Sequence, residues 1–309
     1  MAAIGVDLGG TKVLGVLVEG GEVVAQAKLD TPRGGADQVV TAVAECARRL
    51  GDPAAVAGVG VGAPGVVASG TGDVVRAPNL AGFEARVPLG AMLAAALDGA
   101  RVVVDNDVNA ALLAEHRLGA GRASNDVLGV WVGTGVGGAL VLDGRLRRGP
   151  GGGAGEIGHT TVAGVDRRCG CGQLGHLEAV AGRAAMEDEA RRRHAAGEHT
   201  ALVELAGRKR MKSSVFAKAL DAGDQLAGEL LDDAVAALGA ALSSAAALVD
   251  LDLVVVGGGL ADKLGSQFVG RVEQAVRTRL FVPTSALRVV PAALGDLAGA
   301  LGAALLLDA

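Results

Sequence analysis

Short runs of aliphatic residues alternate with glycine-rich turns over the first thirty positions. Apolar residues dominate positions 4–7, 13–18 and 23–29, and the segments 8–12 and 19–22 between them are rich in Gly. Runs of this length, bounded by turn residues, predict β-strands, here a meander of three. The chain then alternates between helical and strand patterns, with helices over 38–50, 89–97 and 108–118 and strands over 56–61 and 102–104.

The second half of the chain has a similar order of patterns. Strands over 126–132 and 139–142 flank a turn at 133–138, and Asp143-Gly144 is a typical hairpin dipeptide. Helices over 179–196, 214–222 and 224–249, a strand over 253–256 and an apolar helix over 296–307 follow. The apolar stretch 234–260 contains Asp250 and Asp252, so we interpret it as a buried helix and strand and not as a membrane span.

This repeated order predicts an α/β protein of two related domains. We expect the boundary within 118–124. The predicted domains are 1–118, joined by the C-terminal helix 296–309, and 119–295 with its own loop of cysteines and histidines.

Composition removes several classes of function. Half of the residues are hydrophobic, 20% are charged and the formal net charge is −5, which excludes a disordered chain and disfavours binding to a nucleic acid backbone. Aromatic residues make up 2%, too few for a base-stacking platform. Three cysteines indicate a reducing compartment, and the N-terminus lacks a signal-peptide pattern. We therefore expect a cytoplasmic protein that binds neither nucleic acid nor a membrane.

Two glycine-rich turns between strands occupy equivalent places in the two halves. They contain Asp7, Gly9, Gly10, Thr11 and Lys12, and then Gly133, Thr134, Gly135, Gly137 and Gly138. Glycine lets backbone N–H groups approach an anion, and a carboxylate at a strand end suits Mg²⁺. The first turn alone is better explained as a plain hairpin, and the second is not a Rossmann loop because a strand follows it. The pair predicts a nucleotide whose phosphates are held by two hairpins.

Two further clusters carry candidate chemistry. Asp105, Asn106, Asp107 and Asn109 lie between a strand and a helix, where a carboxylate serves as an N-cap or, in a polar ligand site, as a general base. His159, Cys169, Cys171 and His176 fall within eighteen residues of one another. Two thiolates and two imidazoles make a closed tetrahedral Zn²⁺ site, which is structural because no position stays open. Such a zinc would fix the loop that presents Glu156 and Glu178.

Together these motifs resemble the ROK family of sugar kinases and repressors over essentially the whole chain. The similar segments are DLGGTK (7–12), GAPG (62–65), APN (77–79), DNDVNAA (105–111), GTGVGGA (133–139), EIGH (156–159), CGCGQLGHLE (169–178) and VVVGGGL (254–260). The resemblance implies an actin-like, ribonuclease-H-like fold of two α/β domains around a central cleft. It also implies ATP-dependent phosphorylation of a hexose, with glucose as the expected sugar, and a homodimer or homotetramer.

The resemblance also implies roles for single residues. Asp107 would be the general base on the sugar hydroxyl. The sugar would be bound by Gly65, Asn79, Asn106, Asp107, Glu156, His159 and Glu178. The two glycine-rich turns would hold Mg-ATP, and Gly257, Gly258 and Gly259 would form a turn on the adenosine side.

Two departures from the family pattern keep alternatives open. His176 stands where the family has its third zinc cysteine, and Asp105 stands where glucokinases of the family often have Glu and several hexosamine kinases have Asp. One alternative is an N-acetylhexosamine kinase or another hexose kinase. Because the family also contains repressors, a second is a non-catalytic sugar-sensing regulator. The basic clusters 191–193 and 208–212 are interpreted as a solvated helix face and a loop, as is typical of an acidic chain.

Overall fold

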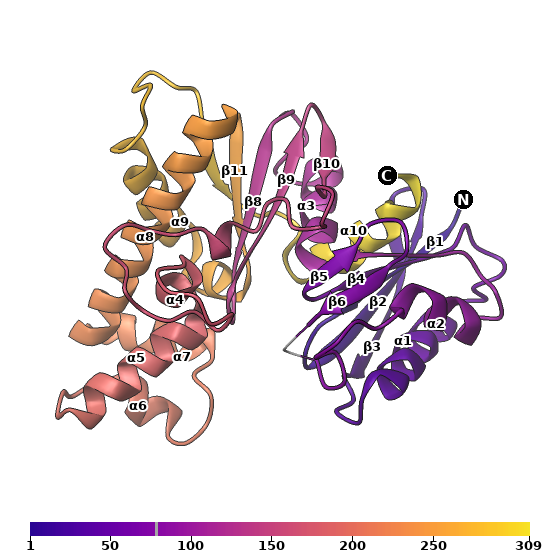
Figure 1. Ribbon diagram of the computed structural model, residues 1–309, viewed down its shortest axis with the longest axis horizontal. Helices are drawn as coiled ribbons and strands as arrows, with labels where there is room; N and C mark the ends of the chain where they lie inside the picture. Colours follow the sequence, from indigo (N-terminus) through magenta and orange to yellow (C-terminus); the bar gives the residue numbers. More distant parts are fainter. Residues whose placement is uncertain (78–79) are drawn as a thin grey trace. The chain divides into compact units, whose positions relative to one another are not determined.

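The computed structural model describes residues 1–77 and 80–309 (Figure 1). Its contacts divide the chain into two compact units. The first unit comprises Met1–Ala123, Ala139–Gly155 and Ala293–Ala309, and the second comprises Ser124–Gly138 and Glu156–Ala292. The division of the sequence into domains at 118–124 stays a prediction; the compact units differ from it in grouping 139–155 with the N-terminal residues.

The first unit is built on a five-stranded sheet in the order β3-β2-β1-β4-β7. Its strands are β1 (Ala3–Leu8), β2 (Lys12–Glu19), β3 (Glu22–Asp30), β4 (Val59–Ala63) and β7 (Val102–Asn106), of which the first three form the predicted meander. The helices are α1 (Ala36–Leu50), α2 (Leu89–Ala96), α3 (Asp107–Leu118) and α10 (Ala298–Leu305). β5 (Val66–Ala68) and β6 (Asp73–Arg76) form a small hairpin that the sequence patterns did not indicate.

Successive residues of β1 face opposite sides of this sheet, and a different helix covers each side. Ile4 and Val6 are fully buried in the cluster that includes α1, whereas Gly5 faces α10. Gly5 pairs with Gly60 of β4, and both lie against the α10 backbone. The two glycines thus let α10 pack closely on the sheet, on the face opposite α1 (Figure 1).

We expect Gly60→Ala to destabilise the first unit. A Cβ at Gly60 would lie 1.7 Å from the carbonyl oxygen of Ala303, a backbone atom that cannot rotate away. Overpacking of this kind costs about 1–3 kcal/mol, which urea unfolding measures. As a control, Gly270→Ala in an exposed, open helix position should stabilise by up to about 1 kcal/mol. Equal midpoints for Gly60→Ala and the unmodified protein would contradict this packing.

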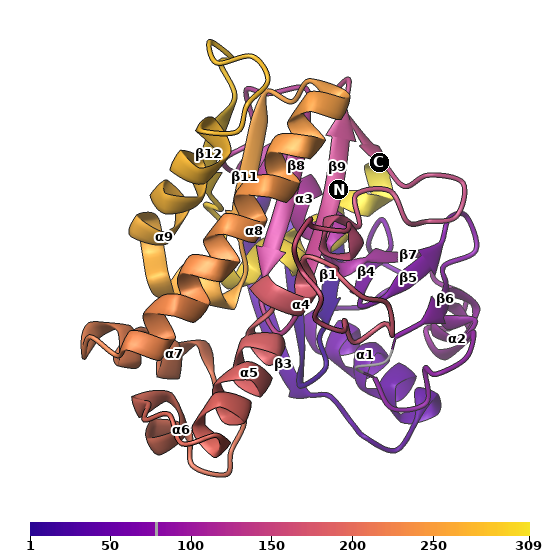
Figure 2. The same cartoon turned by 60° about the vertical axis from the view of Figure 1, so that its left-hand side comes forward.

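The second sheet has the order β10-β9-β8-β11-β12 (Figure 2). Its strands are β8 (Val127–Val132), β9 (Val136–Leu142), β10 (Arg145–Arg147), β11 (Leu253–Gly257) and β12 (Arg288–Pro291). By the division above, β10 and most of β9 belong to the first unit and the other strands to the second. The helices of the second unit are α4 (Glu178–Ala181), α5 (Arg183–Ala195), α6 (Ala201–Ala206), α7 (Ser213–Asp221), α8 (Gln225–Val249) and α9 (Gly259–Arg277). α9 packs on β8, β11 and β12, and α8 packs on α9. Positive φ angles at Asp143 and Gly144 (53° and 70°) confirm the predicted hairpin turn between β9 and β10.

Several predicted elements were wrong in extent. The strand expected at 56–61 begins at Val59, and the turn expected at 133–138 is shorter because β9 already begins at Val136. The helix expected over 179–196 is two helices, since Gly182 is extended between α4 and α5. The C-terminal helix is α10 flanked by 3-10 turns at Gly295–Leu297 and Leu306–Asp308. The patterns did not indicate α6, α9 or β12.

Helix α8 has the length and hydropathy of a membrane span. Its buried residues include Leu226, Leu230, Leu238 and Leu242, and it packs on α4, α5, α7 and α9. The Asp224 side chain caps its N-terminus, and Asp250, with φ 51°, ends it. By these contacts α8 is a core helix, as the sequence predicts.

Candidate active site and metal centre

The acidic segment between β7 and α3 is fixed by hydrogen bonds from its own residues. Asn106 is the N-cap of α3: its side-chain oxygen accepts from the backbone N–H groups of Val108 (2.8 Å) and Asn109 (3.0 Å). Its amide nitrogen donates to the carbonyl of Gly65 (2.9 Å). Asp107 is the first residue of α3, half-buried, where the helix dipole stabilises a negative charge. Because Asn106 supplies the cap, the helix does not need Asp107 for that purpose.

The buried side chain of Asp105 holds the segment between β7 and α3 in place. It is buried, and its Oδ1 accepts from the backbone N–H of Asn106 (2.7 Å) and from the side chain of Asn109 (2.8 Å). Its Oδ2 lies 2.5 Å from Nε of Arg148. Sequence reasoning missed Arg148 because it is 43 residues away along the chain and belongs to no motif. The pair ties the loop after β10 to the segment that carries Asp107.

We expect Arg148→Ala to lower both stability and activity. Removing the guanidinium leaves a buried carboxylate without its cation, at a cost of about 3 kcal/mol. Loss of the orienting contact should also reduce kcat by up to about 100-fold, because small displacements of reacting groups are costly. The matched control is Arg147→Ala, since Arg147 pairs with Asp143 on the surface and should contribute at most about 1 kcal/mol. Indistinguishable kcat values in the two variants would contradict a positioning role for Arg148.

The turn between β1 and β2 holds the first set of candidate phosphate-binding residues. The N–H of Gly9 donates to the carbonyl of Lys12 (2.9 Å), which makes it a hairpin turn. The predicted Gly10 and Thr11 are exposed, and Nζ of Lys12 lies 3.3 Å from Asp296. Asp7 lies at the end of β1, with its carboxyl carbon against Gly299. Burial raises the pKa of Asp7 to about 6, although Lys12 acts in the opposite direction.

In the second unit, the turn at Gly133 to Gly135 lies beside the turn at Gly257 to Gly259. They follow the adjacent parallel strands β8 and β11. Gly258, with φ 92°, lies so close to Val132 that a Cβ would be 2.7 Å from its backbone nitrogen. A Cβ at Gly259 would lie 3.7 Å from Oγ of Ser213. The turn after β8 spans Gly133, Thr134 and Gly135, whereas the predicted Gly137 and Gly138 belong to β9, and Gly257 ends β11.

The predicted sugar-binding acids Glu156 and Glu178 lie near one another in the second unit. Burial raises the pKa of Glu156; the charge of Glu178 adds to this effect, and His159 opposes it. Both oxygens of Glu178 have partners, since Oε2 accepts from the backbone N–H of Val136 (3.0 Å) and Oε1 accepts from the thiol of Cys169 (3.4 Å). Glu178 therefore links the turn after β8 to the cysteine and histidine cluster. Asn79, also predicted to bind the sugar, lies outside the described residues.

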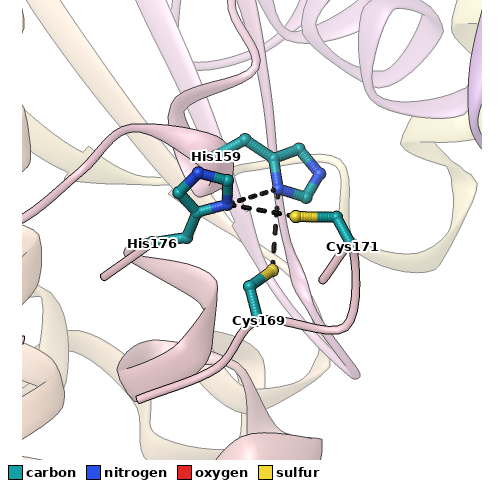
Figure 3. A group of neighbouring side chains, drawn as sticks. All are labelled: His159, Cys169, Cys171 and His176. Atoms are coloured by element: carbon teal, nitrogen blue, oxygen red, sulfur yellow. Dashed lines mark hydrogen bonds between the residues drawn. The ribbon is translucent and has the colours of Figure 1, made fainter. Parts of the chain in front are cut away.

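His159, Cys169, Cys171 and His176 converge with their ligand atoms within 4.8 Å of one another (Figure 3). The Nδ1 atoms of His159 and His176 are 3.4 Å apart, Sγ of Cys169 is 3.8 Å from the first, and Sγ of Cys171 is 3.3 Å from the second. Ligand atoms of a tetrahedral zinc site, with Zn–N of about 2.0 Å and Zn–S of about 2.3 Å, are about 3.3–3.8 Å apart. The four side chains thus fit a zinc ion. Burial raises the pKa of the Cys169 thiol to about 12, so without a cation it is neutral.

Two α/β units, each with a glycine-rich turn that precedes an antiparallel strand, define the actin-like ATPase fold predicted from the sequence. The chain belongs to the ROK family, whose model matches residues 3–309. It is 33% identical to a glucokinase of Thermotoga maritima over 97% of this chain and 95% of the relative, and 30% identical to an N-acetylmannosamine kinase of Yersinia pestis over 89% and 88%. A crystal structure of a ROK family glucokinase from Streptomyces griseus, in complex with glucose and AMPPNP, is 33% identical, with a TM-score of 0.84 and 99% of each chain covered. These findings confirm the predicted fold class and the family resemblance.

Proposed function

We propose that this protein is an ATP-dependent hexose kinase that converts glucose and ATP into glucose 6-phosphate and ADP. The observation that carries the proposal is the fixed position of Asp107, at the start of α3 in a segment held by Asn106 and Asp105, in a chain of the ROK family. The glucokinase relatives and the glucose- and nucleotide-bound structure support the choice of substrates.

In the proposed reaction, Asp107 accepts the proton of the sugar hydroxyl as that oxygen attacks the γ-phosphorus of ATP. The bond from the γ-phosphorus to the bridging oxygen breaks, and ADP leaves. Phosphoryl transfer demands positioning and charge neutralisation more than covalent chemistry, so a fixed carboxylate and aligned backbone N–H groups are the groups required. Gly65, Asn79, Asn106, Glu156, His159 and Glu178 are the proposed sugar-binding residues.

For the nucleotide, we propose that the turn from Asp7 to Lys12 and the turn from Gly133 to Gly135 bind the phosphates, with the Gly257 to Gly259 turn on the adenosine side. Asp7 is the carboxylate best placed to hold Mg²⁺, since it is the second-last residue of a strand that leads into a glycine turn. Mg²⁺, when bound, neutralises phosphate charge.

We further propose that His159, Cys169, Cys171 and His176 hold a structural Zn²⁺. The ligand spacing supports this assignment, and His176 takes the place of a cysteine of the family pattern. When bound, the ion joins residues 159 and 169–176 into one rigid loop next to Glu156 and Glu178. We place the enzyme in the cytoplasm, as a homodimer or homotetramer without nucleic acid or membrane partners.

The test is Mg-ATP-dependent release of ADP with glucose, mannose, fructose, allose, N-acetylglucosamine and N-acetylmannosamine as separate acceptors. Glucose should give the highest kcat/KM. Asp105 and the N-acetylmannosamine kinase relative favour one second candidate, an N-acetylhexosamine kinase. Preference for an N-acetylated sugar would show that the enzyme is an N-acetylhexosamine kinase and not a glucokinase. No turnover with any of the six sugars would overturn the glucokinase proposal in favour of a rarer sugar substrate or a sugar sensor.

A further inference from the structure

The N-terminus of helix α5 packs against the turn after β8, and the side chain of its first residue, Arg183, contacts that turn. The backbone N–H of Arg183 donates to the carbonyl of Gly133 (3.1 Å), and that of Ala184 donates to the carbonyl of Thr134 (2.9 Å). Nη2 of Arg183 also donates to the hydroxyl of Thr134 (2.8 Å). A guanidinium group therefore lies at the side chain of a proposed phosphate-binding residue, and no step of the reaction above uses it.

The same guanidinium group holds a second segment. Its Nη1 donates to the carbonyl of Met211, and the N–H of Met211 donates to the buried carboxylate of Glu187 (3.0 Å). Arg191 donates to the carbonyl of Lys209 (2.6 Å). Residues 207–212 are thus fastened to α5 at several points, with Met211 fully buried.

This segment carries four positive side chains that point into solvent: Arg208, Lys209, Arg210 and Lys212. We call them the cationic loop. Across residues 1–77 and 80–309, no member of this loop forms an ion pair with a carboxylate. The basic residues of α5 differ, because Arg191, Arg192 and Arg193 pair with Glu187, Glu189, Glu198 and Glu229. The cationic loop is therefore a fixed and uncompensated positive surface.

The surroundings of Arg183 favour an anionic ligand. Burial lowers the pKa of its guanidinium, and the nearby charge of Arg210 acts in the same direction, whereas Glu187 opposes it. Uncompensated positive charge of this kind attracts and concentrates an anion. The loop also leads directly to Ser213, the first residue of α7, which lies against Gly259 of the second glycine turn.

We propose that Arg183 binds the phosphate chain of the nucleotide donor at Thr134, and that the cationic loop raises the affinity for that chain through its charge. A guanidinium fork matches the geometry of phosphate oxygens and forms charge-assisted hydrogen bonds with them. This inference rests on the proposed function, since it assumes that the turn after β8 faces the phosphates. It adds a recognition element that depends on the number of phosphates and not on the base.

The test is direct binding by calorimetry, without sugar, of ATP, ADP, AMP and inorganic tripolyphosphate. We expect Arg183→Ala to weaken ATP and tripolyphosphate at least tenfold, ADP less, and AMP least. Arg183→Lys should fall between, because the charge remains and the fork is lost. The double variant Arg208→Gln with Arg210→Gln should flatten the salt dependence of ATP binding.

Arg192→Ala is the matched control, because it removes a positive side chain of α5 that contacts Glu189 and neither Thr134 nor the cationic loop. Equal losses for AMP and ATP in Arg183→Ala, or the same graded loss in Arg192→Ala, would overturn the inference. An unmodified protein that binds tripolyphosphate but not ATP would contradict the proposed kinase and leave the phosphate site supported. An unmodified protein that binds neither tripolyphosphate nor ATP would overturn both the kinase proposal and the phosphate site.

Discussion

Replacing Asp107 by Asn should reduce kcat for glucose phosphorylation by about 100-fold to 10,000-fold, the range expected for loss of a general base. The amide is isosteric but cannot accept the proton of the sugar hydroxyl. The fold should survive, because Asn106 rather than Asp107 supplies the main cap of α3, and an amide oxygen can still accept from Val108. Initial rates with saturating glucose and ATP give the measurement.

Two controls make the result specific to the base. The affinity for glucose, measured by calorimetry, should change by less than the rate does, and the midpoint of urea unfolding should stay close to that of the unmodified protein. Asn109→Ala is the comparison variant, since it removes one hydrogen bond to Asp105 but no proton acceptor. An Asp107→Asn protein with ordinary kcat would refute the assignment.

Loss of a zinc ligand is the second large effect we expect. Cys169→Ser and Cys171→Ser should each lower the zinc content from about one ion per chain to a small fraction, measured by elemental analysis of purified protein. Glucose affinity should fall with it, because the loop that loses the ion borders Glu156 and Glu178, two of the proposed sugar-binding residues.

Variants at two other positions sharpen this test. Cys46→Ser changes a buried cysteine of the first unit that is not a member of the cluster, so zinc content should stay unchanged. His176→Cys restores the cysteine of the family pattern and should keep a full complement of zinc. Stoichiometric zinc in both serine variants, or no zinc in the unmodified protein expressed with zinc present, would rule out the proposed site.

Sequence patterns predicted most of the fold because hydrophobic periodicity is a local property. The meander, α1, α3 and α8 follow directly from it. The break at Gly182 could not be predicted, because it depends on close packing at this position. A Cβ added at Gly182 would lie 2.7 Å from the carbonyl oxygen of Glu178. β12 is a short parallel strand whose only signal is its pairing with β11, a contact distant in sequence.

The candidate site shows the same limit. Its motif residues could be found because their types and spacing are unusual, and the four zinc-ligand candidates do converge. Arg148 and Arg183 could not be found, because an arginine in a loop or at a helix start carries no signal until its partner is known. Their partners, Asp105 and Thr134, are 43 and 49 residues away.

The path of the chain between the compact units has a consequence for synthesis on the ribosome. The chain passes from one unit to the other four times, after residues 123, 138, 155 and 292. The sheet formed by the first 106 residues therefore lacks α10 until the last segment emerges, and Gly5 and Gly60 stay uncovered until then. A nascent chain released before residue 298 would expose an apolar sheet face, which makes premature termination a route to aggregation and proteolysis and makes the N-terminal unit dependent on the final helix.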